Sequence, residues 1–200
     1  MIPILYESTE TAFNSNGLGR LAECVSCTVT EERNGIYECQ FVYPISGANY
    51  SKIQEGRIIA CRHDETTDIQ PFDIYARSAP INGLVTFYAH HISYRLGNVI
   101  LKPFTATSCA GAIAKFTTEN INENPFAFWT DKETVGDFTS ATPVSVKALL
   151  GGTQGSLLDV FGSGEYEFDR FTVKLHLNRG EDTGIQIRYG KIIMTELYLL

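Results

Sequence analysis

The chain has 200 residues, which is enough to bury a substantial core without disulfides. Its 44% hydrophobic and 20% charged residues exclude a disordered chain, and its formal net charge of −7 excludes general affinity for phosphate backbones. The N-terminus has no basic segment followed by a long apolar one, and no apolar run approaches the ~20 residues of a membrane span. We expect a soluble chain made in the cytoplasm, with no specific nucleic-acid binding and no membrane insertion.

A β-hairpin is predicted around Gly35, because the runs on both sides alternate apolar and polar side chains. A two-residue turn would pair Val29 with Gln40 and set an apolar face against a polar one. A three-residue loop, 33–35, pairs Val29 with Cys39 and matches the faces. We therefore predict that loop, with Gly35 in the left-handed conformation of a bulge.

Further strands are predicted at 56–61, 72–76 and 84–94, with a hairpin turn at 80–83. Several short strands at close spacing, with turn residues between them, are typical of a small antiparallel barrel or sandwich. The high content of Tyr and Phe agrees with a β-rich chain. We place a first, N-terminal β-barrel domain at residues 1–96.

The pattern changes at Gly97, where helical spacing replaces alternation, so we expect an inserted α+β domain at 97–163. Thr107 and Ser108 can cap a helix at 109–118, with Ala110, Ile113 and Ala114 on its apolar stripe. A second helix is predicted from Pro143 to Leu150, stopped by Gly151 and Gly152, and a third at 156–161, stopped by Gly162.

Residues 164–191 are predicted to form a two-stranded ribbon. Leu177 facing Ile185, Leu175 facing Ile187 and Val173 facing Tyr189 place every apolar side chain on one face. We expect residues 164–200 to return from the inserted domain to the sheet of the first domain, as the truncated start of a longer remainder. The outer strand of the ribbon is then an unpaired edge that is open to association.

Cys24 and Cys27 have the spacing of half a zinc site or of a redox pair. A zinc ribbon needs a second pair, and Cys39, Cys61 and Cys109 are isolated in the sequence, so core packing is the preferred interpretation of Cys27. The two histidines of His90-His91 point to opposite faces of a strand and cannot share one ion. We expect free thiols and no bound metal or cofactor.

None of the residues that resemble catalytic groups forms a convincing site. The acidic pairs Glu31-Glu32 and Glu181-Asp182 lie beside turns, where charge is usually solvated. Ser156 lacks the glycine pattern of a nucleophile elbow, and the glycines of 151–155 lack the Lys-Ser/Thr of a phosphate loop. Helix ends explain these residues better, so we predict no catalytic residue.

Seven stretches, in order and over nearly the whole chain, resemble the N-terminal region of phage minor structural proteins, the tail-tip or baseplate hub family. This family includes tail-associated lysins and prophage endopeptidase tail proteins of phages that infect Gram-positive hosts. The stretches are TEERNGIYE (30–38), QPFDIY (70–75), HISYRL (91–96), LLGG (149–152), SLLD (156–159), GEYEFD (164–169) and NRGEDTGIQIRYGK (178–191).

The resemblance implies a baseplate-hub fold, in which related β-barrels carry inserted α+β domains and assemble as a homotrimer. It also implies a place at the virion tail tip, in a ring that contacts the distal tail protein and through which the tape measure protein and then DNA leave. An acidic balance suits such a conduit. A non-enzymatic virion component is thus the expected function, and a tail-associated peptidoglycan hydrolase is the alternative.

The sequence departs from the family pattern at its end. Family members continue into a second barrel and a variable part that carries any hydrolase, whereas this sequence ends at Leu200 with the stretch IIMTELYLL (192–200), which departs from the family pattern. This departure predicts a truncated product. We expect it to be mostly monomeric or weakly associated, because half of each ring interface would be absent.

Overall fold

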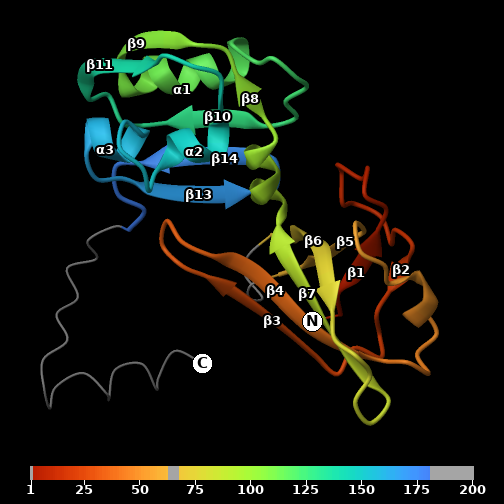
Figure 1. Ribbon diagram of the computed structural model, residues 1–200. Helices are drawn as coiled ribbons and strands as arrows, with labels where there is room; N and C mark the ends of the chain where they lie inside the picture. Colours follow the sequence, from red (N-terminus) through yellow and green to blue (C-terminus); the bar gives the residue numbers. More distant parts are fainter. Residues whose placement is uncertain (1, 63–67, 181–200) are drawn as a thin grey trace, which may run out of the picture.

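The computed structural model describes residues 2–62 and 68–180, which form two units (Figure 1). The first is built on one antiparallel sheet, and the second combines three helices with three small sheets. The expectation of a β-rich α+β chain is confirmed. The elements of the first unit are β1 (Ile4–Tyr6), β2 (Gly19–Arg20), β3 (Ser26–Glu31), β4 (Tyr37–Pro44), η1 (Tyr50–Lys52), β5 (Ile58–Cys61), β6 (Gln70–Arg77), β7 (Leu84–His91) and η2 (Ile92–Gly97).

The seven strands form a curled sheet in the order β2-β1-β5-β6-β7-β4-β3. Six spacings of ~4.8 Å would separate the edges of a flat sheet by about 29 Å. Residues 21–25 connect the two edge strands, and the chain from Arg20 to Ser26 reaches about 22 Å at most. The edges must therefore approach each other, so the sheet curls around its buried face. A barrel of the hub type, with an inserted domain, stays a prediction.

The buried face of the curled sheet carries large side chains from alternate positions. In β4, Tyr37, Cys39, Phe41 and Tyr43 are buried, while the residues between them are partly or fully exposed. Phe41 stacks on Phe87 of β7, with ring centroids 5.0 Å apart. The predicted alternation of this strand is confirmed, and it supplies much of the core of the first unit.

The β3–β4 hairpin has the predicted register but a different turn conformation. Val29 lies opposite Cys39, and the Gly35 N–H donates to the Glu32 carbonyl at 3.0 Å across the three-residue loop. The positive φ falls on Asn34, at 53°, and not on Gly35. The prediction of a left-handed Gly35 is therefore wrong. Asparagine also tolerates this conformation, and here its side chain gains two hydrogen bonds outside the hairpin.

The turn before β7 is confirmed at Asn82 and Gly83. Both have positive φ, 51° and 77°, and Ile81 and Leu84 exchange two backbone hydrogen bonds of 2.9 Å. This is the two-residue type I′ geometry that Asn-Gly favours. The strand that follows ends at His91 and continues as η2, so it is shorter than predicted.

The second unit packs its helices and strands around a separate core. None of the helices in the described ranges is long and apolar enough to cross a membrane. The elements of this unit are β8 (Ile100–Leu101), β9 (Phe104–Ser108), α1 (Cys109–Thr118), β10 (Ala127–Thr130), β11 (Val135–Ser140), β12 (Val144–Ser145), α2 (Val146–Leu150), α3 (Leu157–Phe161), β13 (Glu165–Asp169) and β14 (Thr172–His176).

The strand β14 lies between β10, which is parallel to it, and β13, which is antiparallel. Val173 and Leu175 are buried, as the alternation predicts. Their predicted partners at 185–189 lie outside the described residues. Both edges of β14 are occupied by β10 and β13. The described strands of this stretch therefore pair within the second unit, and their further sheet partner is β10 rather than a strand of the first sheet.

The helix α1 has the predicted bounds and cap, and the Ser108 Oγ accepts a hydrogen bond from the Gly111 N–H at 3.1 Å. Ala110 and Ala114, which were predicted on its apolar stripe, are exposed. The larger Phe116 faces the core instead and sets the rotation of the helix. The buried positions of α1 are Cys109, Ala112, Ile113 and Phe116.

The helix α2 begins three residues later than predicted. Pro143 is not its first residue, because Val144 and Ser145 pair with β8 as β12. Ser145 then caps the helix by accepting a hydrogen bond from the Ala148 N–H at 3.4 Å. The third helix agrees with its prediction, with Ser156 at the N-cap and a positive φ of 78° at Gly162.

The two serine caps predict different responses to the same substitution. Ser108→Ala removes a hydrogen bond to an otherwise unpaired helix N–H, so the free energy of unfolding should fall by about 1 kcal/mol. The buried Ser156 Oγ has no hydrogen-bond partner among the residues described. Ser156→Ala should therefore change this free energy by less than about 0.5 kcal/mol or raise it. Urea unfolding followed by circular dichroism measures both values, and equal losses would contradict the assignment.

Candidate functional site

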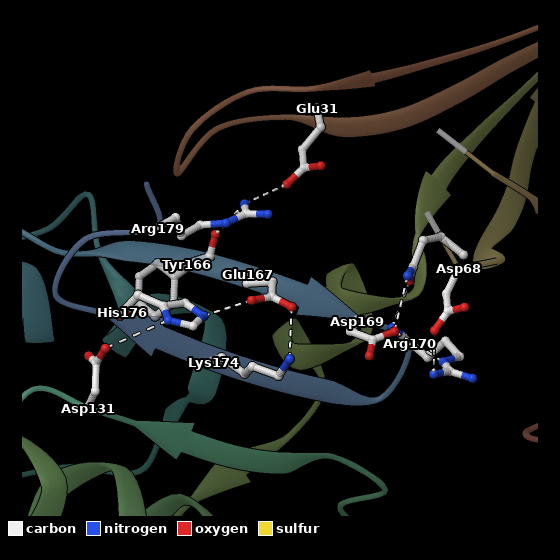
Figure 2. A network of polar contacts seen from close by, with 11 residues as sticks. Glu31, Asp68, Asp131, Tyr166, Glu167, Asp169, Arg170, Lys174, His176 and Arg179 are labelled. Atoms are coloured by element: carbon white, nitrogen blue, oxygen red, sulfur yellow. Dashed lines mark hydrogen bonds and ion pairs between the residues drawn. The ribbon is translucent and has the colours of Figure 1, made fainter. Parts of the chain in front are cut away.

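The β13–β14 hairpin of the second unit lies against the first unit, and polar side chains gather along this seam (Figure 2). Two aromatic residues of the hairpin connect the cores. Phe168 packs against the main core of each unit. Phe171 packs against the core of the second unit and against a smaller hydrophobic cluster of the first unit. The Phe171 ring centroid lies 5.4 Å from that of Phe126 and 6.3 Å from that of Phe13. The hairpin is thus shared by both units.

Asn34, at the tip of the β3–β4 hairpin, holds the start of β13. Its Nδ2 donates to the Gly164 carbonyl at 2.8 Å, and its Oδ1 accepts from the Tyr166 N–H at 2.9 Å. One amide side chain thereby makes the two bonds that a neighbouring strand would make at the edge of a sheet. Asn34 makes both side-chain hydrogen bonds while its backbone is in the left-handed conformation, with a positive φ.

Two ion pairs flank the Asn34 contact. The guanidinium of Arg33 lies 3.0 Å from the Glu165 carboxylate, and Arg179 donates to the Glu31 carboxylate at 2.9 Å (Figure 2). Arg179 also donates to the Tyr166 carbonyl at 3.2 Å. These side chains are partly exposed, so each pair stabilises the seam by about 1 kcal/mol at most. These two ion pairs contribute more to the relative orientation of the two units than to the free energy that holds the units together.

A buried amide connects the units at the far end of the hairpin. The Gln70 Nε2 donates to the Asp169 Oδ1 at 3.1 Å, and its Oε1 accepts from the Arg170 N–H at 2.8 Å. The same oxygen lies 3.3 Å from the Nε2 of His91. Burial raises the pKa of Asp169, but hydrogen bonds from Gln70 and Arg170 outweigh it, so the pKa lies below its usual value. The Gln70 side chain therefore binds the turn of the β13–β14 hairpin to the first unit, as the Asn34 side chain binds the start of β13.

His91 is fully buried, and its hydrogen bonds fix its tautomer. The Ser93 N–H donates to Nδ1 at 3.2 Å, so Nδ1 carries no proton and Nε2–H donates to Gln70. The ring stacks on Tyr37 with centroids 4.3 Å apart. Burial lowers the pKa of His91 to about 3, because a second proton would be desolvated and would face the Ser93 N–H. The Ser93 hydroxyl lies 3.0 Å from Nδ1, but both residues are closed to substrate.

The exposed side of β14 carries a second polar group of side chains. The Glu167 carboxylate accepts from Lys174 at 2.8 Å and lies 2.7 Å from His176 Nε2 (Figure 2). Burial raises the pKa of Glu167, but these two partners outweigh it, so its pKa is lowered. Asp131 lies 3.8 Å from the other ring nitrogen of His176. No hydroxyl or thiol bonds to His176 among the described residues, so this arrangement orients charges and has no nucleophile to activate.

Three cysteines that the sequence separates come together inside the curled sheet. The Sγ atoms of Cys27 and Cys61 each lie 3.6 Å from the Sγ of Cys39. Cys39 and Cys61, which are isolated in the sequence, are thus neighbours in space. Cys109 lies in the other core, on α1. Packing of Cys27 against the first core is confirmed.

A cleft of about 610 Å³ lies on the other side of the seam, between β6–β7 and the loop before β10. On its wall, Arg95 binds the Asp73 carboxylate through two hydrogen bonds of 2.6 and 2.8 Å. His90 stacks between Tyr75 and Tyr94, with centroids 5.1 and 4.9 Å away. The arginine charge is neutralised by its partner, so the cleft offers no free cation to an anionic ligand.

The remaining residues considered in the sequence do not form a site. His90 and His91 lie on opposite faces of β7, as predicted. Glu31 is paired with Arg179, and Glu181-Asp182 lies outside the described residues. Gly155 belongs to the turn before α3, where its N–H donates to Asp159 at 2.8 Å.

Sequence analysis missed the amide contacts of the seam. The sequence places Asn34 in the predicted loop and Gln70 just before the predicted strand at 72–76, whereas the structure includes Gln70 in β6. Neither position reveals a partner more than 90 positions away. Only the burial of Gln70 in the structure indicates that it must have a polar partner.

Two substitutions of Asn34 should distinguish how much its side-chain hydrogen bonds and its backbone conformation each contribute to the free energy of unfolding. Asn34→Gly keeps the positive φ but loses both bonds, so we expect the free energy of unfolding to fall by about 1–2 kcal/mol. Asn34→Ala should cost about 1 kcal/mol more, because alanine disfavours this φ. Urea denaturation provides the measurement. Asn82→Gly is the control, since the Asn82 side chain makes no hydrogen bond to the described residues, and a loss there as large as at Asn34 would contradict the interpretation.

The buried His91 predicts that acid destabilises the protein. Its folded-state pKa, about 3, lies below the ordinary value of 6.5, so below pH 6.5 the unfolded chain binds a proton that the folded chain does not. Stability is present above pH 6.5 and is lost as the pH falls towards 3. Between pH 7 and pH 5, His91 alone should lower the free energy of unfolding by about 2 kcal/mol.

Denaturant titrations at several pH values measure this slope. The pKa of His90 is also lowered by burial, so part of the slope should persist without His91. His91→Gln should reduce the slope between pH 7 and pH 5. An unchanged slope in that variant would show that other groups cause the pH dependence.

Comparison with known proteins identifies similar folds but no family. No protein-family model and no curated protein matches the chain. The crystal structure of prophage tail protein gp18 from Listeria monocytogenes EGD-e has a TM-score of 0.58 and 14% identity, over 88% of this chain and 50% of that one. The tail protein from Neisseria meningitidis MC58 has a TM-score of 0.54 and 9% identity, over 87% and 49%. At these identities the likeness shows a shared fold. The chain spans about half the length of these two structures.

Proposed function

We propose that the chain is a structural component of a phage or prophage tail. The observation that carries this proposal is the fold likeness to two tail proteins, which extends over 87–88% of the chain and therefore includes both units. A local motif or a single common domain would match less of the chain. The sequence stretches that resemble minor structural proteins lie in both units, so they support the same class independently.

More finely, we propose a place at the tail tip, as part of the baseplate-hub ring through which the tape measure protein and DNA leave. The two units and the curled antiparallel sheet suit the hub architecture of a barrel with an inserted domain. The net charge of −7 suits a wall that DNA passes without binding. The expected partners are other copies of the chain in a homotrimer, the distal tail protein and the tape measure protein of a phage with a Gram-positive host.

We also propose that the chain has no enzymatic role of its own. His90 is stacked between tyrosines, His91 is buried, and His176 is held by carboxylates without a nucleophile among the described residues. The polar groups at the seam bind one another, and in the neighbouring cleft the Arg95 charge is paired with Asp73. The alternative is a tail-associated peptidoglycan hydrolase.

Immunogold electron microscopy tests the location. An antibody raised against the purified chain should label phage particles at the end of the tail opposite the capsid. Label along the tail tube would contradict the position in the hub but would still support a structural role in the tail. Particles without label would contradict the proposal as a whole.

A zymogram serves as the control for enzymatic activity. The purified chain should leave Gram-positive cell walls intact, whereas lysozyme in a neighbouring lane clears them. Clearing by the chain would favour the hydrolase. In that case His176→Ala and Glu167→Gln would show whether the group on β14 is responsible.

A further inference from the structure

The three clustered cysteines come from strands on different parts of the curled sheet. Cys27 lies on β3, Cys39 on β4 and Cys61 on β5. The strands β4 and β5 are separated in the sheet by β7 and β6, yet the Cys39 and Cys61 sulfurs are 3.6 Å apart. The contact therefore crosses the interior, and it exists only because the sheet is curled.

The cluster consists of sulfur ligands alone, in a compact triangle. All three Sγ atoms lie within 4.8 Å of one another, and no histidine or carboxylate joins this group in the described parts of the chain. Cys39 and Cys61 are buried, with 2% and 0% exposure, whereas Cys27 is partly exposed. A small species can thus reach the triangle from the side of Cys27.

The three sulfurs already contact one another as thiols, through Sγ–Sγ distances of 3.6 Å from Cys39 to Cys27 and to Cys61. A metal ion binds thiolate sulfur, so an ion that binds all three sulfurs must displace their protons. Its binding should therefore strengthen as the pH rises.

The size of the triangle suits a thiolate-bound metal ion. A metal–sulfur bond of ~2.3 Å places three sulfurs around a trigonal ion about 4 Å apart. The observed separations, two of 3.6 Å and none above 4.8 Å, come close to this value. We propose that Cys27, Cys39 and Cys61 bind one thiophilic d10 ion, Cu(I) or Zn(II), which ties β3, β4 and β5 together across the interior of the curled sheet.

Thiolate ligands select these soft ions over Mg²⁺ and Ca²⁺, which require oxygen. Cu(I) is satisfied by three sulfurs, whereas Zn(II) takes four ligands. Water can supply the fourth ligand of Zn(II) at a site with three protein ligands. Cys24 lies three positions before Cys27 and packs against the same core, but its sulfur is outside the triangle. Its thiol donates to the Ser26 carbonyl at 3.1 Å and would have to leave that partner to bind the ion.

The test uses the full chain, reduced and kept free of oxygen. It is dialysed against Cu(I) in one arm and Zn(II) in the other, and retained metal and the Tm are measured. We expect one ion per chain in at least one arm. At a free ion concentration about 100 times Kd, the Tm should rise by roughly 5–10 °C, because the folded state alone holds the ligands together. The retained metal should fall as the pH is lowered, because protons compete for the sulfurs.

Matched serine variants locate the site. Cys61→Ser and Cys27→Ser should lower the retained metal at least tenfold, while Cys109→Ser, in the other core, should keep it. If Cys61→Ser fails to fold, the partly exposed Cys27 still provides the comparison. The arm in which one ion per chain is retained identifies the metal. Cys24→Ser should retain the ion if the three sulfurs of the triangle suffice, and loss of Zn(II) in this variant would show that Cys24 is its fourth ligand.

The proposal is overturned if the wild-type chain retains neither ion at one per chain. It is also overturned if Cys27→Ser and Cys109→Ser retain equal amounts. In those cases the three sulfurs are hydrogen-bonded thiols that fill the core. The outcome is independent of the tail role, since immunogold labelling does not depend on a bound metal.

Discussion

The structure depends on one physical constraint, the sharing of the β13–β14 hairpin between two hydrophobic cores. Phe168 and Phe171 are partly buried and each contacts both units, so each contributes less than the ~1.5–3 kcal/mol of a fully buried aromatic side chain. Apolar contact alone does not fix how two surfaces meet. Asn34 and Gln70 do so, because each makes paired bonds to backbone or side-chain groups at one end of the hairpin. Burial thus holds the units together, and the directional amide bonds select one orientation.

The curl of the first sheet is the condition for this arrangement. The short connection at 21–25 forces the edges of the sheet together, and the curled surface then encloses the sulfur triangle on its concave side. The same curl places the tip of the β3–β4 hairpin beside the second unit (Figure 1). A flat sheet of the same strands would expose Cys61 and leave Asn34 without a partner. The proposed metal ion would therefore strengthen a closure on which the seam also depends.

Local structure was predictable from the sequence where one stretch determines it alone. The alternation of β4, the Asn82-Gly83 turn and the Ser108 cap each depend on residues within a few positions. Choice of partner was not predictable in the same way. The alternation of β14 marked its buried face correctly but fits any apolar neighbour, so it did not indicate that β10 and β13 are its partners. The approach of Cys39 to Cys61 requires the curl, which no single stretch contains.

The seam also determines how rigidly the two units are joined. The units are joined by the chain between η2 and β8, by the β13–β14 hairpin, and by Lys147 of α2, whose Nζ lies 3.8 Å from the centre of the Tyr94 ring. Connections at separate points resist rotation, whereas a single linker permits it. The buried contacts at His91 and Gln70 lose little strength to salt, in contrast to the exposed pairs at Arg33 and Arg179. The seam, held by neutral amides and aromatic rings, should therefore keep its geometry over a wide range of salt concentration.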